Sequence, residues 1–342
     1  MKDLKYLFAY TGSIAAFAGL YFGGWWSFGI TYIAFGLIPM LEQFIPSSIS
    51  NHPDEIEDSR SRHPFFDVLL YLHVPILYAA LLFAFYKIEN TPLSLLEKIG
   101  MVFNIGIIVG SFGINVGHEL GHRQNKFEQF LAKILLLPAL YQHFYIEHNR
   151  GHHKNVATEL DPASARLGEN LYAFWIRSVK DSYIDAWQLE NDRLKKEGKT
   201  VFSFENEMLQ FHIYQIAYLI SIKIIFGTPS VFFAIAFAIV GFLLLETVNY
   251  IEHYGLRRQL LPSGRYEAVL PQHSWNSDHE LGRIFLYELT RHSDHHFKAT
   301  RKYQILRHFD ESPQLPFGYP LSMIASLVPP LWFSLMDKRI PK

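Results

Sequence analysis

Long, mostly apolar runs alternate with polar stretches along this chain. A helix needs about 20 mostly apolar residues to cross the hydrocarbon core of a bilayer. Six runs come near that length, at residues 6–22, 27–41, 65–86, 99–116, 211–226 and 230–247. The pattern therefore predicts an all-α integral membrane protein with six transmembrane helices.

Turn residues separate the apolar runs at two places. Gly23-Gly24 and Trp25-Trp26 lie between the first two runs, and Gly227-Thr228-Pro229 lies between the last two. Pro229 suits a helix start because its φ is fixed and it has no N–H to satisfy. We expect a helical hairpin at each place. We also expect the first helix to be a retained anchor, since its apolar run leads directly into a second span.

Basic residues indicate the orientation in the membrane. If spans one to four alternate in direction, one side receives Lys2, Lys5, Arg60, Arg62, Arg123, Lys126, Arg150 and Lys154. The positive-inside rule assigns that side to the cytoplasm.

The fourth span carries glycines at Gly106, Gly110, Gly113, Gly117 and Gly121. Spacings of three and four place them along one helical stripe, which is typical of close packing between membrane helices. A helix packed this closely holds its cytoplasmic end in a fixed position.

Composition limits the chemistry of the chain. The 342 residues are 49 % hydrophobic and 18 % charged, with a formal net charge of −1, so no basic excess exists to bind nucleic acid. Cysteine is absent, which excludes disulfides, thiolate zinc sites, iron–sulfur clusters and a catalytic thiol. Any metal must be held by histidine, aspartate or glutamate, and the chain has 17 histidines.

Nine of these histidines fall in four clusters. The clusters are His118 with His122; His148, His152 and His153; His253; and His292, His295 and His296. Spacings of three and four residues place imidazoles on one helical face, where they can bind one metal ion. Nine imidazoles are more than one metal ion can bind, so we expect two metal ions. Iron, zinc and copper are all suited to imidazole ligands.

Two simpler metal sites fit less well. A zinc metalloprotease would use His118, Glu119 and His122 of the H-E-x-x-H string and leave the other clusters unexplained. The soluble carboxylate-bridged di-iron bundle needs two Glu-x-x-His pairs, and only Glu119 with His122 has that spacing. A histidine-rich pair of irons beneath a membrane bundle instead suits oxygen activation against an apolar substrate.

If the clusters meet, they also fix the topology. The apolar stretch 127–145 must then start and finish on the same side of the membrane, so it is expected to be a helix that does not span the bilayer. The apolar stretch 321–336 is interrupted by Pro329-Pro330 and is also not expected to span. The predicted organisation is 1–117, transmembrane helices one to four; 118–206, a cytoplasmic histidine-box region; 207–250, helices five and six; and 251–342, a cytoplasmic part that completes the metal site.

Four segments that contain these histidines resemble a known protein family. The strings HELGH from His118, EHNRGHH from Glu147, NYIEHYGL from Asn249 and RHSDHH from Arg291 look like the histidine boxes of the integral-membrane alkane 1-monooxygenases. The third string is the most specific, because related fatty-acyl desaturases share the other boxes more loosely. Segments 161–166 and 273–277 also resemble the family, whereas Thr290 and Phe297 depart from its usual pattern.

The resemblance implies a non-haem di-iron enzyme of the bacterial inner membrane, with its active site on the cytoplasmic side. Such an enzyme inserts one oxygen atom of O2 into the terminal methyl of a medium-chain n-alkane. Its nine ligands carry over to His118, His122, His148, His152, His153, His253, His292, His295 and His296. Candidates that orient these rings are Glu119, Glu147, Asp161, Glu252 and Asp294, each of which is equally well explained as a solvated charge.

The resemblance also implies external electron donors, a rubredoxin and a flavin rubredoxin reductase. The chain itself has no G-x-G-x-x-G motif. Basic residues Arg123, Lys154, Arg257 and Arg258 are suited to an acidic partner or to anionic membrane lipid. A fatty-acyl desaturase or hydroxylase with the same irons stays the nearest alternative, and the zinc metalloprotease a more remote one.

Overall fold

The computed structural model describes residues 2–341, and these residues are mainly helical. Within them, strand-like pairing is confined to two isolated bridges, Leu260 with Tyr266 and Asn276 with Gln314. The predicted all-α class is therefore confirmed. The chain divides into two compact units: a first unit of Met1–Gly36, Phe65–Glu147 and Tyr183–Leu245, and a second unit of Leu37–Pro64, His148–Ser182 and Glu246–Lys342.

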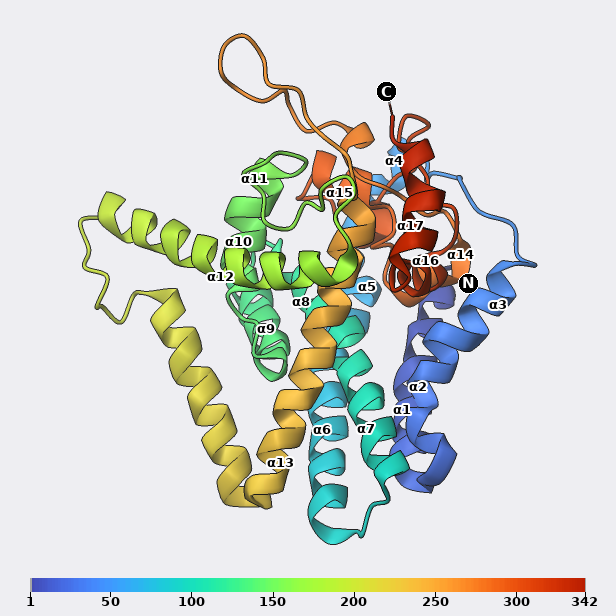
Figure 1. The fold of residues 1–342 in the computed structure, drawn as a ribbon, viewed down its shortest axis with the longest axis vertical. Helices are drawn as coiled ribbons and strands as arrows, with labels where there is room; N and C mark the ends of the chain where they lie inside the picture. Colours follow the sequence, from blue (N-terminus) through green and yellow to red (C-terminus); the bar gives the residue numbers. More distant parts are fainter. Residues whose placement is uncertain (1, 342) are drawn as a thin grey trace. The chain divides into compact units, whose positions relative to one another are not determined.

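The helices of the first unit range from 3 to 18 residues in length (Figure 1). They are η1 (Lys2–Ala9), α1 (Tyr10–Phe22), η2 (Gly24–Phe28), α2 (Gly29–Tyr32), η3 (Ile33–Leu37), α5 (Pro64–Tyr71), α6 (His73–Asn90), α7 (Leu95–Ile108), η4 (Val109–Ile114), α8 (Asn115–Gly121), α9 (Lys126–Leu136), η5 (Leu137–Ala139) and α10 (Phe144–Glu147). The longest helices, α12 (Leu171–Lys196) and α13 (Glu207–His253), each continue from one unit into the other along the chain.

The second unit contains shorter helices joined by irregular segments. They are α3 (Ile38–Glu42), α4 (Asp54–Ser61), η6 (His148–His152), α11 (His153–Asn155), η7 (Pro271–His273), α14 (Glu280–Phe285), α15 (His292–Phe297), η8 (Tyr303–Ile305), α16 (Tyr319–Ser326), α17 (Pro329–Met336) and η9 (Asp337–Arg339). The helices α16 and α17 replace the apolar stretch 321–336 and are too short to cross a bilayer.

Four helical stretches are long and apolar enough to cross a membrane: Gly24–Glu42, Pro64–Asn90, Leu95–Gly121 and Glu207–His253. The last stretch contains two predicted spans, because Gly227 leaves the helical conformation with φ 77° and ψ 172° just before Pro229. The predicted first span is helical too, but several tyrosines and small polar residues reduce its hydropathy, and it is not among the four. The full six-span topology stays a prediction.

The segment that follows the first histidine pair does not form a long helix. Helix α9 has 11 residues, which corresponds to about 16 Å of length. Residue Leu140, with φ 50°, ends the short η5 turn after it. An element of this length is about half of what the roughly 30 Å hydrocarbon core requires.

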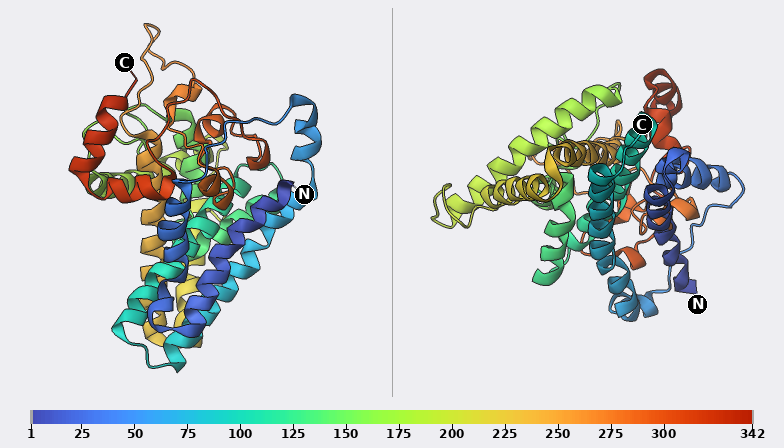
Figure 2. Two further views of the ribbon diagram at one scale, coloured as in Figure 1. Left: turned by 90° about the vertical axis from the view of Figure 1, so that its right-hand side faces the viewer. Right: turned by 90° about the horizontal axis from the view of Figure 1, so that it is seen from below.

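Glycines let helices α7 and α13 pack closely in the first unit. A Cβ placed on Gly106 would lie 2.4 Å from Cβ of Val240, and one on Gly241 would lie 2.6 Å from Cγ1 of Val109. Figures 1 and 2 show α6, α7 and the part of α13 after its kink running side by side. The predicted role of the glycine stripe in close packing is confirmed at Gly106 and at Gly110, where an added Cβ would lie 2.7 Å from Leu244.

A buried amide also connects the membrane helices of this unit. The side chain of Asn104 on α7 accepts a hydrogen bond from the backbone N–H of Ile30 at 3.0 Å and donates one to the carbonyl of Ala16 at 3.0 Å. Ile30 is the second residue of α2, so its N–H has no partner within that helix. One side chain therefore satisfies a helix start and links three helices.

The close packing at Gly106 yields a stability prediction. We expect Gly106→Ala to destabilise the protein by about 1–3 kcal/mol, because the added methyl overlaps Val240 and forces the helices apart. Thermal unfolding of the detergent-purified protein measures this effect. Gly36→Ala is the matched control, since nothing lies within 4 Å of its added Cβ. Equal melting temperatures for the two variants would show that the contact does not support the fold.

Candidate metal centre

Seven of the nine predicted ligand histidines belong to the second unit. His148 and His152 lie in the π-helical turn η6, and His153 lies at the start of α11. In a π-helix the hydrogen bonds run from i to i+5, so residues five apart come together. Accordingly Nε2 of His153 lies 3.0 Å from Nε2 of His148. His148 is therefore grouped with His153 and not with His152, which α-helical spacing would pair with it.

Four buried imidazoles form one group, which we name the four-imidazole group: His152, His253, His292 and His296. One ligand nitrogen from each lies within 4.8 Å of the others. The Nε2 atom of His292 is 3.2 Å from that of His253 and 2.9 Å from that of His296. The Nε2 atom of His296 is also 3.2 Å from that of His152. The rings come from η6, from the end of α13 and from α15.

Three further histidines of the second unit form another group, which we name the three-imidazole group: His148, His153 and His295. Their ligand nitrogens also lie within 4.8 Å of one another. Helix α15 thus serves both groups, because His292 and His296 are one turn apart on one side, while His295 points to the other group. A single short helix fixes the spacing between the two groups.

The remaining pair, His118 and His122, belongs to the first unit. Helix α8 ends at Gly121, and His122 is the residue that caps it. The two ring centroids are 4.8 Å apart with the planes nearly perpendicular. The ligand nitrogens of the pair lie within 4.8 Å of each other, as the spacing of four residues predicts.

The four-imidazole group fits a metal ion. A neutral imidazole nitrogen has either one hydrogen or one lone pair, so it can complete only one hydrogen bond. Nε2 of His292 and Nε2 of His296 each face two other ring nitrogens, which hydrogen bonds alone cannot satisfy. Nitrogens bound about 2.1 Å from one cation would lie roughly 3.0–3.4 Å apart, close to the distances found here.

The protonation state of the buried rings agrees with this interpretation. Burial, together with the neighbouring imidazoles, holds the pKa of His296 well below its ordinary value. The ring is therefore neutral at physiological pH, which is the form that donates a lone pair to a metal.

A carboxylate orients one ring of the four-imidazole group. Nδ1 of His152 lies 2.9 and 3.1 Å from the two carboxylate oxygens of Asp161, which leaves Nε2 to face the group. Asp161 also accepts hydrogen bonds from Ser164 Oγ at 2.5 Å and from the N–H of Ala163 at 3.1 Å. Burial opposes ionisation of Asp161, but His152 and these hydrogen bonds outweigh it, so its pKa is lowered. Carboxylate–histidine pairs of this kind hold metal ligands in one orientation.

A second carboxylate lies at the edge of the same group. Oε2 of Glu252 is 3.1 Å from Nε2 of His292, and the hydroxyl of Tyr319 donates to Oε1 of Glu252 at 2.8 Å. Both side chains are fully buried. Tyr319 is 67 positions from Glu252 in the sequence, and no local pattern indicates the contact.

The other predicted carboxylates have different partners. Asp294 accepts hydrogen bonds from Arg301 at 2.6 Å and from the N–H of Arg307 at 2.8 Å. Glu119 pairs with Arg123 at 2.6 Å, and Glu147 is buried at the end of α10. Asp294 and Glu119 therefore bind arginine side chains, whereas Glu147 packs beside the second histidine box.

The predicted basic surface patch is wrong at Arg123. Its side chain is 6 % exposed and pairs with Glu119 and, at 3.4 Å, with Asp67. Arg258 is also engaged, since its guanidinium donates to the carbonyls of Glu267 and Lys154. Arg123 thus binds two carboxylates and Arg258 binds two backbone carbonyls, so both side chains contribute to the fold.

Histidines outside the four boxes have structural surroundings. His73 is buried in α6 between the rings of Tyr10 and Phe112, with centroids 4.8 and 4.6 Å away, as expected of a packed residue. His273 contacts Glu267 at 3.2 Å and accepts from the N–H of Leu270. Neither is part of the two groups of the second unit.

Comparison with known proteins gives a consistent relationship. The fatty acid desaturase family model matches residues 99–324. Alkane 1-monooxygenase 1 of Alcanivorax borkumensis and an alkane 1-monooxygenase of Ectopseudomonas oleovorans are each 40 % identical over 319 residues, which cover 93 % of this chain and 79 % of the relative. The hydroxylase component of a Pseudomonas putida xylene/toluene monooxygenase is 28 % identical over 99 % of this chain and 89 % of its own length.

With two relatives at this identity over most of both chains, and with histidine groups suited to metal ions, the chain belongs to the alkane 1-monooxygenase family and to the wider fatty acid desaturase family.

Proposed function

We propose that this protein is an alkane 1-monooxygenase that converts medium-chain n-alkanes to 1-alkanols. Dioxygen supplies one oxygen atom to the terminal methyl, and two electrons and two protons reduce the other atom to water. The observation that carries the proposal is the convergence of buried imidazole nitrogens in a chain with membrane-spanning helices. Relatives at 40 % identity with this name support the substrate class.

The proposed cofactor is a pair of non-haem iron ions held by the nine box histidines. The four-imidazole group would bind one iron, and the three-imidazole group would contribute to the second. Their spacing in the sequence supports His118 and His122 as the remaining ligands of the two irons. Bound iron supplies the oxygen-activating redox chemistry that no amino-acid side chain of this protein provides.

The residues of the chain prepare the site for that chemistry. Burial of the four-imidazole group excludes water, and the neutral rings present lone pairs without competing protons. Asp161 fixes the ring of His152, and Tyr319 fixes the carboxylate of Glu252 beside His292. We infer that these two carboxylates would offset the positive charge of the ions, and that Asp161 would hold the ring of His152 in one orientation.

The electrons must come from outside the chain, because it has neither cysteine for an iron–sulfur centre nor a dinucleotide motif. We propose a rubredoxin as donor, reduced in turn by a flavin rubredoxin reductase. We also propose the six-span topology in the bacterial inner membrane with the histidines on the cytoplasmic side. Four membrane-spanning candidates and the basic residues near their ends support this orientation.

The first test measures metal and product together. We expect purified protein to contain about two iron atoms per chain, the number that nine imidazoles can hold. With octane, O2 and a reduced rubredoxin system it should form 1-octanol. Zinc as the sole metal with peptide cleavage would overturn the proposal in favour of a metalloprotease. A product with a double bond would overturn it in favour of a desaturase.

The second test compares two buried histidines replaced by the same residue. We expect His253→Phe to lose most of its iron and all turnover, because one nitrogen of the four-imidazole group is removed. His73→Phe should keep both, since its neighbours are aromatic rings that accept a phenyl group. Elemental analysis and an octanol assay provide the readouts. Equal iron contents in the two variants would contradict the assigned ligands.

The third test addresses the carboxylate behind His152. We expect Asp161→Asn to weaken iron retention by about 10–100-fold, because the amide no longer provides the negative charge that orients the ring. Iron loss against increasing chelator concentration measures this effect. Asp181→Asn is the control, since Asp181 pairs with Lys180 on an exposed part of α12. Identical chelator curves for both variants would remove Asp161 from the site.

A further inference from the structure

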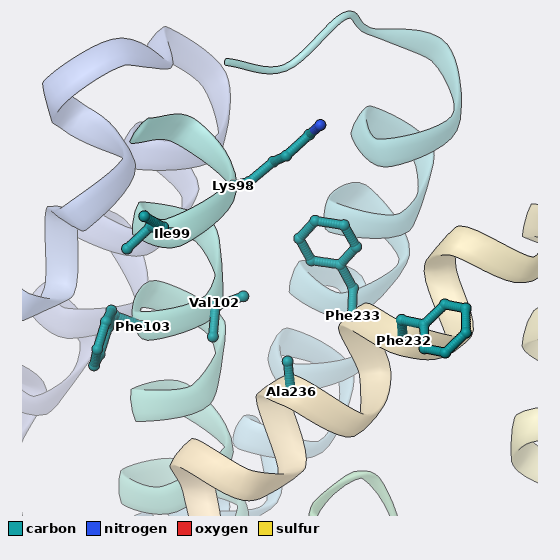
Figure 3. Close-up of a pocket in the computed structure, with 7 residues that line it drawn as sticks. All are labelled: Lys98, Ile99, Val102, Phe103, Phe232, Phe233 and Ala236. Atoms are coloured by element: carbon teal, nitrogen blue, oxygen red, sulfur yellow. The ribbon is translucent and has the colours of Figure 1, made fainter. Parts of the chain in front are cut away.

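A groove opens between α7 and the part of α13 that follows its kink (Figure 3). It is about 410 Å³ in volume, and all of its lining residues belong to the first unit. The lining consists of Lys98, Ile99, Val102, Phe103, Phe232, Phe233 and Ala236. Six of these side chains are apolar, so the groove is suited to a hydrocarbon chain.

One charged side chain lies at the mouth of the groove. Lys98 is in the first turns of α7, and Figure 3 shows its ammonium group extending across the opening. The neighbouring Glu97 is directed elsewhere, because its carboxylate accepts hydrogen bonds from the N–H of Gly24 at 2.9 Å and from the N–H and hydroxyl of Ser94. The groove therefore combines an apolar interior with a cation at its entrance.

The surfaces around the groove face the bilayer. Phe232 is 69 % exposed and Phe103 is 44 % exposed, although both lie in stretches long and apolar enough to span a membrane. Exposed phenyl rings on such helices contact lipid chains rather than water. The groove is consequently open to the surrounding lipid.

The groove does not lead toward the histidines. One to two turns beyond Val102 and Ala236, the close contact of Gly106 and Gly110 with Val240 and Leu244 leaves no room for a chain between α7 and α13. Lys98 is also about 30 Å along the helix axis from His118, the thickness of the hydrocarbon core. An alkane in this groove would lie at the opposite side of the membrane from the ligand pair on α8.

From these features we propose that the groove binds one acyl chain of a membrane phospholipid, with the lipid phosphate at the Lys98 ammonium. An alkane would gain nothing from a charge at the entrance, whereas a phospholipid has both a hydrocarbon chain and an anionic group at the required ends. A bound acyl chain fills the space between α7 and α13 next to their close contact at Gly106 and Gly110. It would thereby support the helix pair whose far end carries the metal ligands.

Photo-crosslinking of the full-length protein tests the proposal. The protein is reconstituted in phosphatidylethanolamine vesicles that contain phosphatidylglycerol with a diazirine on its acyl chain. After irradiation, we expect labelled peptides that contain Val102 and Phe233. Ala236→Trp fills the groove and should remove most of this label. Lys98→Gln should reduce it by about five-fold, which corresponds to roughly 1 kcal/mol for one lysine at a membrane surface.

Matched variants control for non-specific effects. Ile225→Trp and Lys223→Gln alter exposed positions of α13 outside the groove, and both should keep the full label. The hypothesis fails if Ala236→Trp is labelled as strongly as the unmodified protein. It also fails if excess octane displaces the lipid label while Lys98→Gln has no effect, because the groove would then be an alkane site.

Discussion

The structure depends on one electrostatic requirement: ring nitrogens that converge in a buried space need a cation among them. Nε2 of His292 faces two other nitrogens at 2.9 and 3.2 Å, an arrangement that hydrogen bonds cannot complete. Helices α13 and α15 and the π-turn η6 each deliver at least one of these rings. Asp161, in the segment that follows α11, keeps the ring of His152 oriented, so the local fold and the proposed iron pair support each other.

The π-turn and helix α15 explain how two adjacent groups are built from so few residues. The extra residue per turn in η6 brings His148 and His153 together and leaves His152 for the four-imidazole group. On α15, the i and i+4 positions serve one group while His295 serves the other. Because neighbouring residues belong to different groups, the distance between the groups is set by the backbone itself. This rigidity suits a reaction in which two metal ions must act on one oxygen molecule.

Much of this arrangement could be predicted from the sequence, because it depends on local chemistry. The sequence Gly227-Thr228-Pro229 favours a break in a helix, and the spacing of Gly106 and Gly110 indicates close packing. The division of His148, His152 and His153 could not be predicted, since a π-turn follows from how surrounding elements pack. Nor could the contact of Tyr319 with Glu252, or the burial of Arg123 against Asp67, because both join residues far apart in the chain.

The amide of Asn104 has a consequence for the order in which the protein is assembled. The start of α2 has a backbone N–H that finds its partner only in a helix made about 70 residues later. Until that helix enters the bilayer, the N-terminal hairpin holds a polar group without a partner in hydrocarbon, at a cost of several kcal/mol. The early hairpin is thus an incomplete intermediate during synthesis, and insertion of the segment that leads to the first histidine box is what completes it.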